Sequence, residues 1–497
     1  MIALLAGAVL FTGLGRGRIV TPHEARVADT ALTMARSGMP WNAAPVMVQS
    51  RQVNPWLIPV FQGSIRLKKP PLPYWCTAAA FLVLGAGPGS ARLPTALLGI
   101  GAAALVYCLA RDLAGRRTAF WAALAWVSTF FVSDEFRKTM ADPYLAFFSL
   151  GALAAWVRLG QRAADHRRNV WTAVFYGSIA FGLLAKGPVL LLHLVIPIAL
   201  HGLLYRRWPR LGWPAHALGM ATVLLIALPW PVYVLRHIPD ALEIWRFESV
   251  GEFSDNVRNA RPWWFYIPSL FQLSLPWTPV WVLAIHLSLR RKRRELVFAA
   301  GWCAAIVLIF SFVHMKKNAY LLPLMPAQCL LVGRALALLC AGARLKAPRP
   351  WSKWILDAQV LLGIGFALGI AAMVIVGPVE TGRRRAANAP SRPSIAQVKE
   401  RIAGPAGAAA GVCVVAGLLP MLRAVSRSME RRILVQAAVY SILIVFTLVF
   451  IEAEKANRRE PSMNFANGTI NRLPTVNPQF RTIFILHSCR FNQLAEE

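Results

Sequence analysis

Long apolar runs recur from the first residues of the chain almost to its end. Thirteen can be marked, at residues 1–17, 89–110, 118–134, 143–159, 170–185, 187–204, 214–236, 264–288, 296–313, 319–341, 354–377, 405–423 and 433–452. A helix of about 20 residues crosses a hydrocarbon layer of roughly 30 Å. Because backbone polar groups in lipid must bond to one another, runs of this length predict helices rather than barrel strands. The pattern therefore predicts an all-α polytopic membrane protein with about 13 transmembrane helices.

The composition agrees with a membrane protein and explains its charge. Of 497 residues, 57% are hydrophobic and 15% are charged, and the net charge is +32. Basic clusters such as residues 290–294 follow alternate apolar runs, as expected for cytoplasmic loops. No soluble module with interleaved basic and aromatic residues points to nucleic-acid binding. Most of the seven cysteines lie in apolar runs and none forms a CxxC pair, so we predict neither a disulfide frame nor a metal site, and no cofactor.

The loops between the basic clusters are predicted to face the outside. We assign residues 1–452 to a transmembrane domain whose first external loop is 18–88, and residues 453–497 to a short external tail. Basic residues on this side run against the topological rule and need another explanation. A functional anion site at the outer interface would supply one. The lysines concerned are Lys68, Lys69, Lys186, Lys316 and Lys317.

Residues 67–75 combine two lysines, three prolines and two aromatic side chains. The prolines lack backbone N–H groups, so we expect no regular spanning helix to begin here. Tyr74 and Trp75 suit a half-wet membrane surface, and Lys69 would lie at the height of a lipid phosphate. A proline-rich connector with membrane-anchoring lysines is an equally acceptable interpretation of this segment alone.

Two carboxylates on the same side could take part in chemistry. Glu24 falls in the first turn of a short helix predicted to begin at Thr21 or His23, where an acid suits the helix dipole. Asp142 precedes Pro143 and would be the N-cap of the fourth span. Helix capping and structural ion pairs also account for both acids. Their positions alone therefore predict no reaction.

Further cations occur at the predicted external ends of spans. Lys186 lies between two apolar segments, Lys316 and Lys317 precede Tyr320, and Arg258 precedes an aromatic belt. Snorkelling of long side chains could explain each of them singly. Together they predict one face that carries separate carboxylates and several cations at the lipid boundary. Cations there would stabilise a lipid-linked phosphate as a leaving group, and a carboxylate would take a proton from an acceptor.

Several short segments resemble one known family. They occur in the same order across residues 20–340, at 24–26, 69–75 (Lys-Pro-Pro-Leu-Pro-Tyr-Trp), 90–94, 142–143, 184–188, 275–277 and 320–323. The pattern resembles the bacterial aminoarabinose lipid A transferases and the wider protein O-mannosyltransferase-like glycosyltransferases of the GT-C fold. The segment 69–75 is the most specific of these matches.

The resemblance implies a fold, an activity and a set of site residues. The fold would be GT-C, and the activity a metal-independent, inverting sugar transfer. The donor would be a polyprenyl-phosphate sugar, and the active site would face outward from a bacterial inner membrane. Lys69, Arg26 and Tyr320 match positions that contact the lipid phosphate. The acceptor, which could be a lipid A-like lipid, a protein or another envelope glycan, stays open.

The acidic positions depart from the family pattern. Asp142 matches the second acidic position, but the first is usually an Asp-Glu pair and here reads His23-Glu24. Either residue of that pair could then be the base, since histidine accepts a proton with an unperturbed pKa near ~6.5. Lys68 stands where the family often has Glu, which removes a ligand of a metal site described in some relatives. Relatives of the aminoarabinose branch also carry a sizeable external C-terminal domain, which the tail 453–497 does not match.

Two other functions compete with a transferase. A transporter or flippase of a lipid-linked or anionic solute would place charges inside spans and break helices near the membrane centre. The charges of this chain lie instead near span ends, which favours the enzyme. A non-catalytic scaffold is the third hypothesis, and the departures at His23 and Lys68 keep it open.

Overall fold

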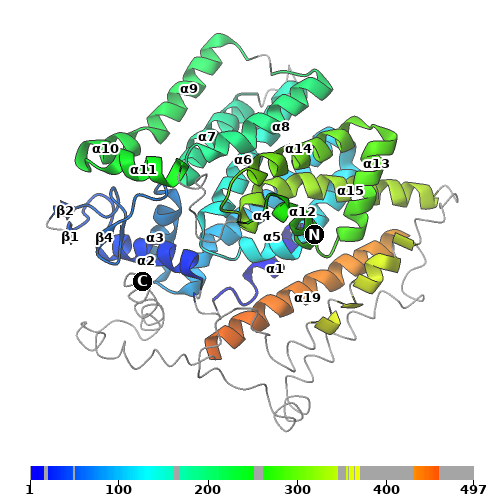
Figure 1. The fold of residues 1–497 in the computed structure, drawn as a ribbon, viewed down its shortest axis with the longest axis horizontal. Coiled ribbons are helices and arrows are strands. Elements are labelled where there is room, and N and C mark those ends of the chain that lie inside the picture. The colour runs from blue at the N-terminus through cyan, green and yellow to red at the C-terminus, as the bar shows by residue number, and fades with distance from the viewer. Residues whose placement is uncertain are drawn as a thin grey trace, which may run out of the picture.

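The computed structural model describes residues 2–15, 19, 21–48, 51–161, 168–209, 211–250, 261–344, 354–355, 357–362, 364–365, 367–369 and 429–457. Over these residues the chain is a bundle of helices with two small β-hairpins at its edge (Figure 1). This architecture confirms the predicted all-α membrane fold.

The helices and strands have the following bounds, and the four strands lie between α2 and α3 in the chain. The helices are α1 (Ile2–Phe11), α2 (Pro22–Arg36), α3 (Leu72–Leu84), α4 (Pro88–Val127), α5 (Phe130–Glu135), α6 (Ala141–Gln161), α7 (Arg168–Lys186), α8 (Val189–Tyr205), α9 (Trp213–Ala227), α10 (Pro229–His237), α11 (Ala241–Val250), η2 (Trp263–Phe265), α12 (Tyr266–Leu273), α13 (Thr278–Arg291), α14 (Arg294–Ser311), η3 (Asn318–Leu324), α15 (Met325–Arg344) and α19 (Met429–Asn457). The strands are β1 (Val46–Val48), β2 (Arg51–Val53), β3 (Val60–Phe61) and β4 (Ser64–Ile65).

The predicted count of thirteen spans is supported in part. Within the described residues, six helical segments are long and apolar enough to cross a membrane, or seven if a bent pair counts as one span. The bent pair consists of Trp263–Leu273 and Thr278–Arg290, and the bend between these two helices is 116°. The predicted spans near α1 and α8 are shorter apolar helices, and the predicted span 405–423 lies outside the described residues.

Helix α4 is a hairpin of two arms, although its hydrogen-bond pattern is nearly continuous. Its internal Gly115 has a φ of 86°, a left-handed conformation that glycine adopts without strain. Trp126 Nε1 donates to the carbonyl of Gly99 at 3.4 Å, although 27 residues separate them. A straight helix would hold these two residues roughly 40 Å apart. The chain therefore reverses at Gly115. The first arm matches the predicted span 89–110, whereas the second arm ends at Val127 and α5 begins at Phe130, so the predicted span 118–134 is interrupted.

The main core lies where α4, α6 and α15 pack together. Trp126, Leu150 and Leu331 are among its fully buried side chains. Helix α19 lies along one edge of this bundle, against α1 (Figure 1). The bundle thereby provides fixed helix ends from which polar side chains can project.

The first predicted external loop is well structured. Helix α2 begins after the N-cap Thr21, whose hydroxyl accepts from the backbone N–H of Glu24 at 3.3 Å, as one of the two predicted starts required. Two antiparallel hairpins follow, β1 with β2 and β3 with β4. Helix α2 packs on α3 (Figure 1).

No helix long enough to span a membrane begins in the proline-rich segment, as predicted, but a short helix does. Helix α3 begins inside it, at Leu72, with Pro73 in the first turn. Proline is accepted there because first-turn N–H groups have no partner within the helix. The helix has 13 residues, about 20 Å, which is too short to cross a membrane unaided. Tyr74, expected to be half wet, is buried in the small core between α2 and α3.

Candidate active site

The first candidate pair joins the start of one helix to the end of the next. Asp142 lies in the first turn of α6, and Lys186 is the last residue of the antiparallel α7. Lys186 Nζ donates to Asp142 Oδ1 at 2.5 Å, and the two side chains are 9% and 10% exposed. An acid at a helix N-terminus and a base at a C-terminus each suit the local dipole. Asp142 was expected at the N-cap itself, but α6 begins one residue earlier, at Ala141.

The backbone position of Lys186 is set by the way α7 ends. Gly187 has a φ of 74°, and its N–H donates to the carbonyl of Leu183 at 2.8 Å, which is a usual form of helix C-terminus. The ammonium lies 4.8 Å from the ring centre of Tyr320 in η3, a cation–π geometry. The structure thus brings together Asp142, Lys186 and Tyr320, which the sequence had singled out separately.

The second candidate pair joins α2 to the loop before η3. Lys317 Nζ lies 3.3 Å from His23 Nε2. The charges that act on the His23 ring are the cations Lys317, Arg26 and Arg66 and the anion Asp142. One carboxylate and three cations therefore influence the charge of His23. Of these residues, only Arg66 was absent from the residues predicted from the sequence.

These surroundings keep His23 neutral. Desolvation by neighbouring protein atoms lowers its pKa from 6.5 to about 4, although the residue as a whole stays exposed, and the charges of Lys317 and Arg26 act in the same direction. A neutral imidazole can accept a proton, but one with so low a pKa is a weak base near neutral pH.

We expect the His23→Asn variant to resist acid better than the parent protein. In the unfolded chain histidine protonates below pH ~6.5, whereas in the fold it does so only near pH 4. The unfolded state therefore binds more protons in this window, and stability falls as the pH drops from 6.5 toward 4. Thermal unfolding of both proteins at several pH values should show equal stability above pH ~7 and a growing advantage of the variant below it. Parallel curves over the whole range would contradict this.

Glu24 is enclosed in a buried ion pair. Its carboxylate accepts from Arg92 Nε at 2.7 Å and from Arg92 Nη2 at 3.4 Å. The backbone N–H of Thr139 donates to the same carboxylate at 3.3 Å. The side chains of Glu24 and Arg92 are 3% and 4% exposed. Arg92 was part of the matched segment 90–94 but received no role, because its partner lies 68 residues away in the sequence.

Residues 134–142 form one wall of the site and are held from two sides. Arg137 donates to the carbonyls of Val9, Leu10 and Thr12 at 3.1, 3.1 and 2.7 Å. The Thr139 hydroxyl donates to the carbonyl of Ala91 in α4 at 2.5 Å. This wall is thereby tied to the end of α1 and the start of α4.

The same wall carries two adjacent carboxylates, Asp134 and Glu135, which were not among the candidate residues predicted from the sequence. Lys138 Nζ donates to Asp134 at 2.5 Å and to Glu135 at 2.7 Å. Burial raises the pKa of Glu135 to about 7, although the Lys138 charge opposes the rise and the carboxylates of Asp134 and Asp142 support it. The sequence offered only two adjacent acids before a predicted loop.

The remaining predicted residues are placed as follows. Lys316 is buried, and its ammonium donates to the carbonyls of Arg261 and Val313 at 3.1 and 2.5 Å. Its charge is therefore used on backbone oxygens. Lys69 and Arg26 are half-buried, and Arg258 lies outside the described residues. Within those residues, no group of three or more His, Cys, Asp or Glu side chains could hold a metal ion.

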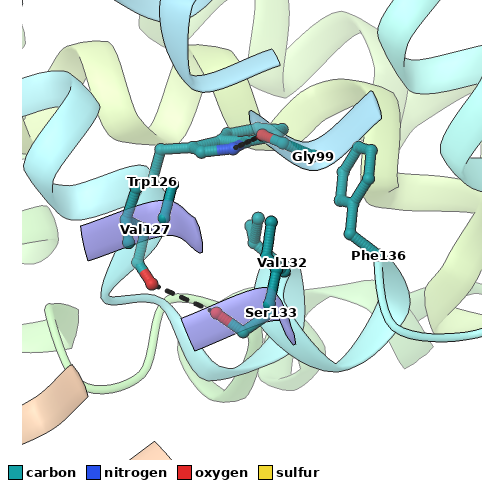
Figure 2. Close-up of a pocket in the computed structure, with 8 residues that line it drawn as sticks. Gly99, Trp126, Val127, Val132, Ser133 and Phe136 are labelled. Carbon is teal, nitrogen blue, oxygen red and sulfur yellow. Dashed lines mark hydrogen bonds between the residues drawn. The ribbon is translucent and has the colours of Figure 1, made fainter. Parts of the chain in front are cut away.

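A small pocket inside the bundle lies apart from these charges (Figure 2). It is lined mainly by apolar side chains of α1, α4 and α5, and its polar groups are satisfied locally. Ser133 Oγ donates to the carbonyl of Val127 at 3.1 Å, and Trp126 bonds to Gly99 as described above (Figure 2). The pocket is therefore a packing defect of the core rather than a place for a charged substrate.

Comparison with known proteins gives similarity at the level of sequence. The family described as dolichyl-phosphate-mannose-protein mannosyltransferase matches residues 47–245. A protein of Aquifex aeolicus is 30% identical over 325 residues, 65% of this chain and 60% of that protein. An undecaprenyl phosphate-alpha-4-amino-4-deoxy-L-arabinose arabinosyl transferase 2 of Pseudomonas fluorescens is 29% identical over 333 residues, 65% of this chain and 57% of that protein. The chain thus spans less than two thirds of the length of these curated relatives.

Solved structures agree at the level of the fold. ArnT from Cupriavidus metallidurans bound to undecaprenyl phosphate superposes with a TM-score of 0.71, at 21% identity, over 98% of this chain and 83% of that one. The apo state of the same protein gives a TM-score of 0.70. By sequence this chain is similar to the aminoarabinose transferases and to the protein mannosyltransferase family, and it has the fold of ArnT.

Proposed function

We propose that this protein is a membrane glycosyltransferase that moves a sugar from a polyprenyl-phosphate donor to an envelope acceptor. The observation that carries the proposal is the meeting of Asp142, Lys186 and Tyr320 with His23 and Lys317 at the ends of packed membrane helices. This gives a carboxylate among several cations, as transfer from a lipid phosphate requires. The names of the Pseudomonas relatives and of the Cupriavidus structure, all of which include undecaprenyl phosphate, support the donor class.

The site would work at the outer, periplasmic face of a bacterial inner membrane, where the predicted topology places it. Lys69, Arg26, Arg66 and Lys317 would hold the donor phosphate. Tyr320 would keep the Lys186 ammonium beside that phosphate through its ring.

In the reaction, Asp142 would accept the proton of an acceptor hydroxyl or phosphate group. The acceptor oxygen then bonds to the anomeric carbon of the sugar, and the bond from that carbon to the phosphate oxygen breaks. The released electron pair stays on the polyprenyl phosphate, whose growing negative charge the cations stabilise. Attack opposite to the leaving group inverts the anomeric centre.

Asp142 suits the role of base better than the other two predicted residues. Glu24 already accepts from three donors and is buried in its pair with Arg92, so we assign it to positioning the 134–142 wall. His23 has a pKa of about 4 and a cation beside its ring. We retain it as a residue that lines the donor site.

The test is a transfer assay with the purified protein. It would use a panel of radiolabelled polyprenyl-phosphate sugars and separate lipid A-like, protein and glycan acceptor fractions. Label that moves to one fraction would establish the enzyme and name both substrates. A folded protein that binds polyprenyl phosphate but transfers no sugar would instead support the transporter or the scaffold.

Replacement of Lys69 by alanine should weaken donor binding more than it slows the chemical step. A hydrogen bond to a charged group contributes roughly 1.5–3 kcal/mol, so we expect KM for the donor to rise about 10- to 100-fold with a smaller change in kcat. Lys68→Ala is the matched control, because Lys68 is the exposed neighbour of the half-buried Lys69. Equal effects of the two substitutions would remove Lys69 from the phosphate site.

A further inference from the structure

The ammonium of Lys186 lies beside both the Asp142 carboxylate and the ring of Tyr320. Lys186 donates a hydrogen bond to the Asp142 carboxylate, and its ammonium also faces the ring of Tyr320. An ammonium has three N–H donors, so this pairing leaves capacity for a further acceptor. The ion pair between Lys186 and Asp142 consists of a single short hydrogen bond to one carboxylate oxygen.

The Glu24 carboxylate is held by more hydrogen bonds than the Asp142 carboxylate. Its carboxylate is held by both ends of a guanidinium fork and by a backbone N–H. Such a bidentate pair is geometrically specific, and Glu24 cannot be released without unpairing a buried arginine. Asp142, by contrast, loses one partner when a single flexible side chain turns away.

The charge balance of the transfer indicates when that turn would occur. Before the reaction, Asp142 carries one negative charge and the donor phosphodiester carries one. Afterwards, Asp142 holds the proton, and the released polyprenyl phosphate carries about two negative charges near neutral pH. One unit of negative charge has thus moved from the carboxylate to the phosphate. A cation placed between them lowers the barrier most if it follows the charge.

Resting on the proposed function, we propose that Lys186 exchanges partners during catalysis. Without donor it pairs with Asp142 and keeps the base occupied. When the donor phosphate arrives it turns to that phosphate, and Asp142 becomes free to accept the acceptor proton. Lys186 is thus more than one of several phosphate ligands, because it couples donor binding to the availability of the base.

The exchange has a signature in binding that needs no turnover. Purified full-length protein in lipid nanodiscs is titrated with undecaprenyl phosphate, as the parent protein and as the variants Asp142→Asn, Lys186→Gln and both combined. Asp142→Asn should bind about tenfold more tightly, because the lysine no longer has to leave a carboxylate, and a coupling of this size is usual for neighbouring charges. Lys186→Gln should bind more weakly. The double variant should match Lys186→Gln within about twofold.

Two controls separate partner exchange from a simple change of net charge. Asp134→Asn removes another carboxylate of the same wall, one that pairs with Lys138, and should leave affinity within about twofold of the parent. Asp142→Ala replaces the Asn variant if the latter does not fold. An equal gain from Asp142→Asn with and without Lys186, or no gain at all, would overturn the exchange. Failure of the folded parent protein to bind undecaprenyl phosphate would instead overturn the proposed function.

Discussion

Replacement of Asp142 by asparagine should lower kcat for sugar transfer by roughly 10²–10⁴-fold, the usual contribution of a positioned general base. Asparagine has nearly the same shape and can still accept from Lys186, so the fold should survive. It cannot take the acceptor proton. The measurement is the rate of label transfer at saturating donor, accompanied by the thermal unfolding curve of each protein.

The Asp134→Asn variant is the appropriate control for this loss. Asp134 belongs to the same wall and also pairs with a lysine, but it has no role in the proposed proton transfer. We expect its rate to stay within a few-fold of the parent, whereas the Asp142 variant loses almost all activity. Transfer at the parent rate in Asp142→Asn would move the base to His23 or Glu24, whose variants His23→Asn and Glu24→Gln should then be the inactive ones.

The largest stability effect is expected at Arg92. Its replacement by methionine leaves the carboxylate of Glu24 buried without its guanidinium partner, and such unpairing commonly costs about 3–5 kcal/mol. Denaturant unfolding should show this loss as a lower midpoint. Much of it should return in the double variant Arg92→Met with Glu24→Gln, because no uncompensated charge then remains buried.

An exposed ion pair provides the comparison. Arg432 Nη2 lies 2.6 Å from Asp357 Oδ1, but these side chains are 27% and 55% exposed. Surface pairs of this kind contribute about 0–1 kcal/mol, so Arg432→Met should hardly change the midpoint. Equal effects at Arg92 and Arg432 would show that burial of the Glu24 pair does not matter to the fold.

Features that depend on neighbouring residues could be predicted from the sequence. Thr21 before a proline and an acid marked the start of α2, and the apolar runs marked both arms of α4. Lys186 was noticeable because a lone cation between two apolar runs needs a partner. The proline-rich segment begins no spanning helix, as predicted, but the short helix α3 that begins there was not predicted, although prolines are accepted in a first helical turn.

Features that depend on distant partners could not be predicted. Neither the pairing of Glu24 with Arg92 nor the hydrogen bonds of Lys316 to backbone carbonyls could be recognised from neighbouring residues. Glu135 was passed over since its raised pKa comes from burial, which depends on packing by other segments. An ionisable side chain can be assigned to a face from the sequence, but whether its charge is free for a substrate depends on the tertiary structure.

The side-chain contacts of the site also constrain how often the chain crosses the membrane. A chain that returns to one surface has made an even number of passages. Glu24 meets Arg92 with only α3 between them, so α3 makes no passage. Helix α6 is long and apolar enough to cross, and Asp142 at its start meets Lys186 at the end of α7, so α7 must cross as well.

The same parity applies between Lys186 and Tyr320, which lie 4.8 Å apart. Helix α8 is a shorter apolar helix, whereas α9 with α10, and α14, are long and apolar enough to cross. An even total then requires that α8 and the bent pair of α12 and α13 either both cross the membrane or both remain on one side. The short α8 and the pair with the 116° bend are thus linked, because neither can cross alone without separating Lys186 from Tyr320.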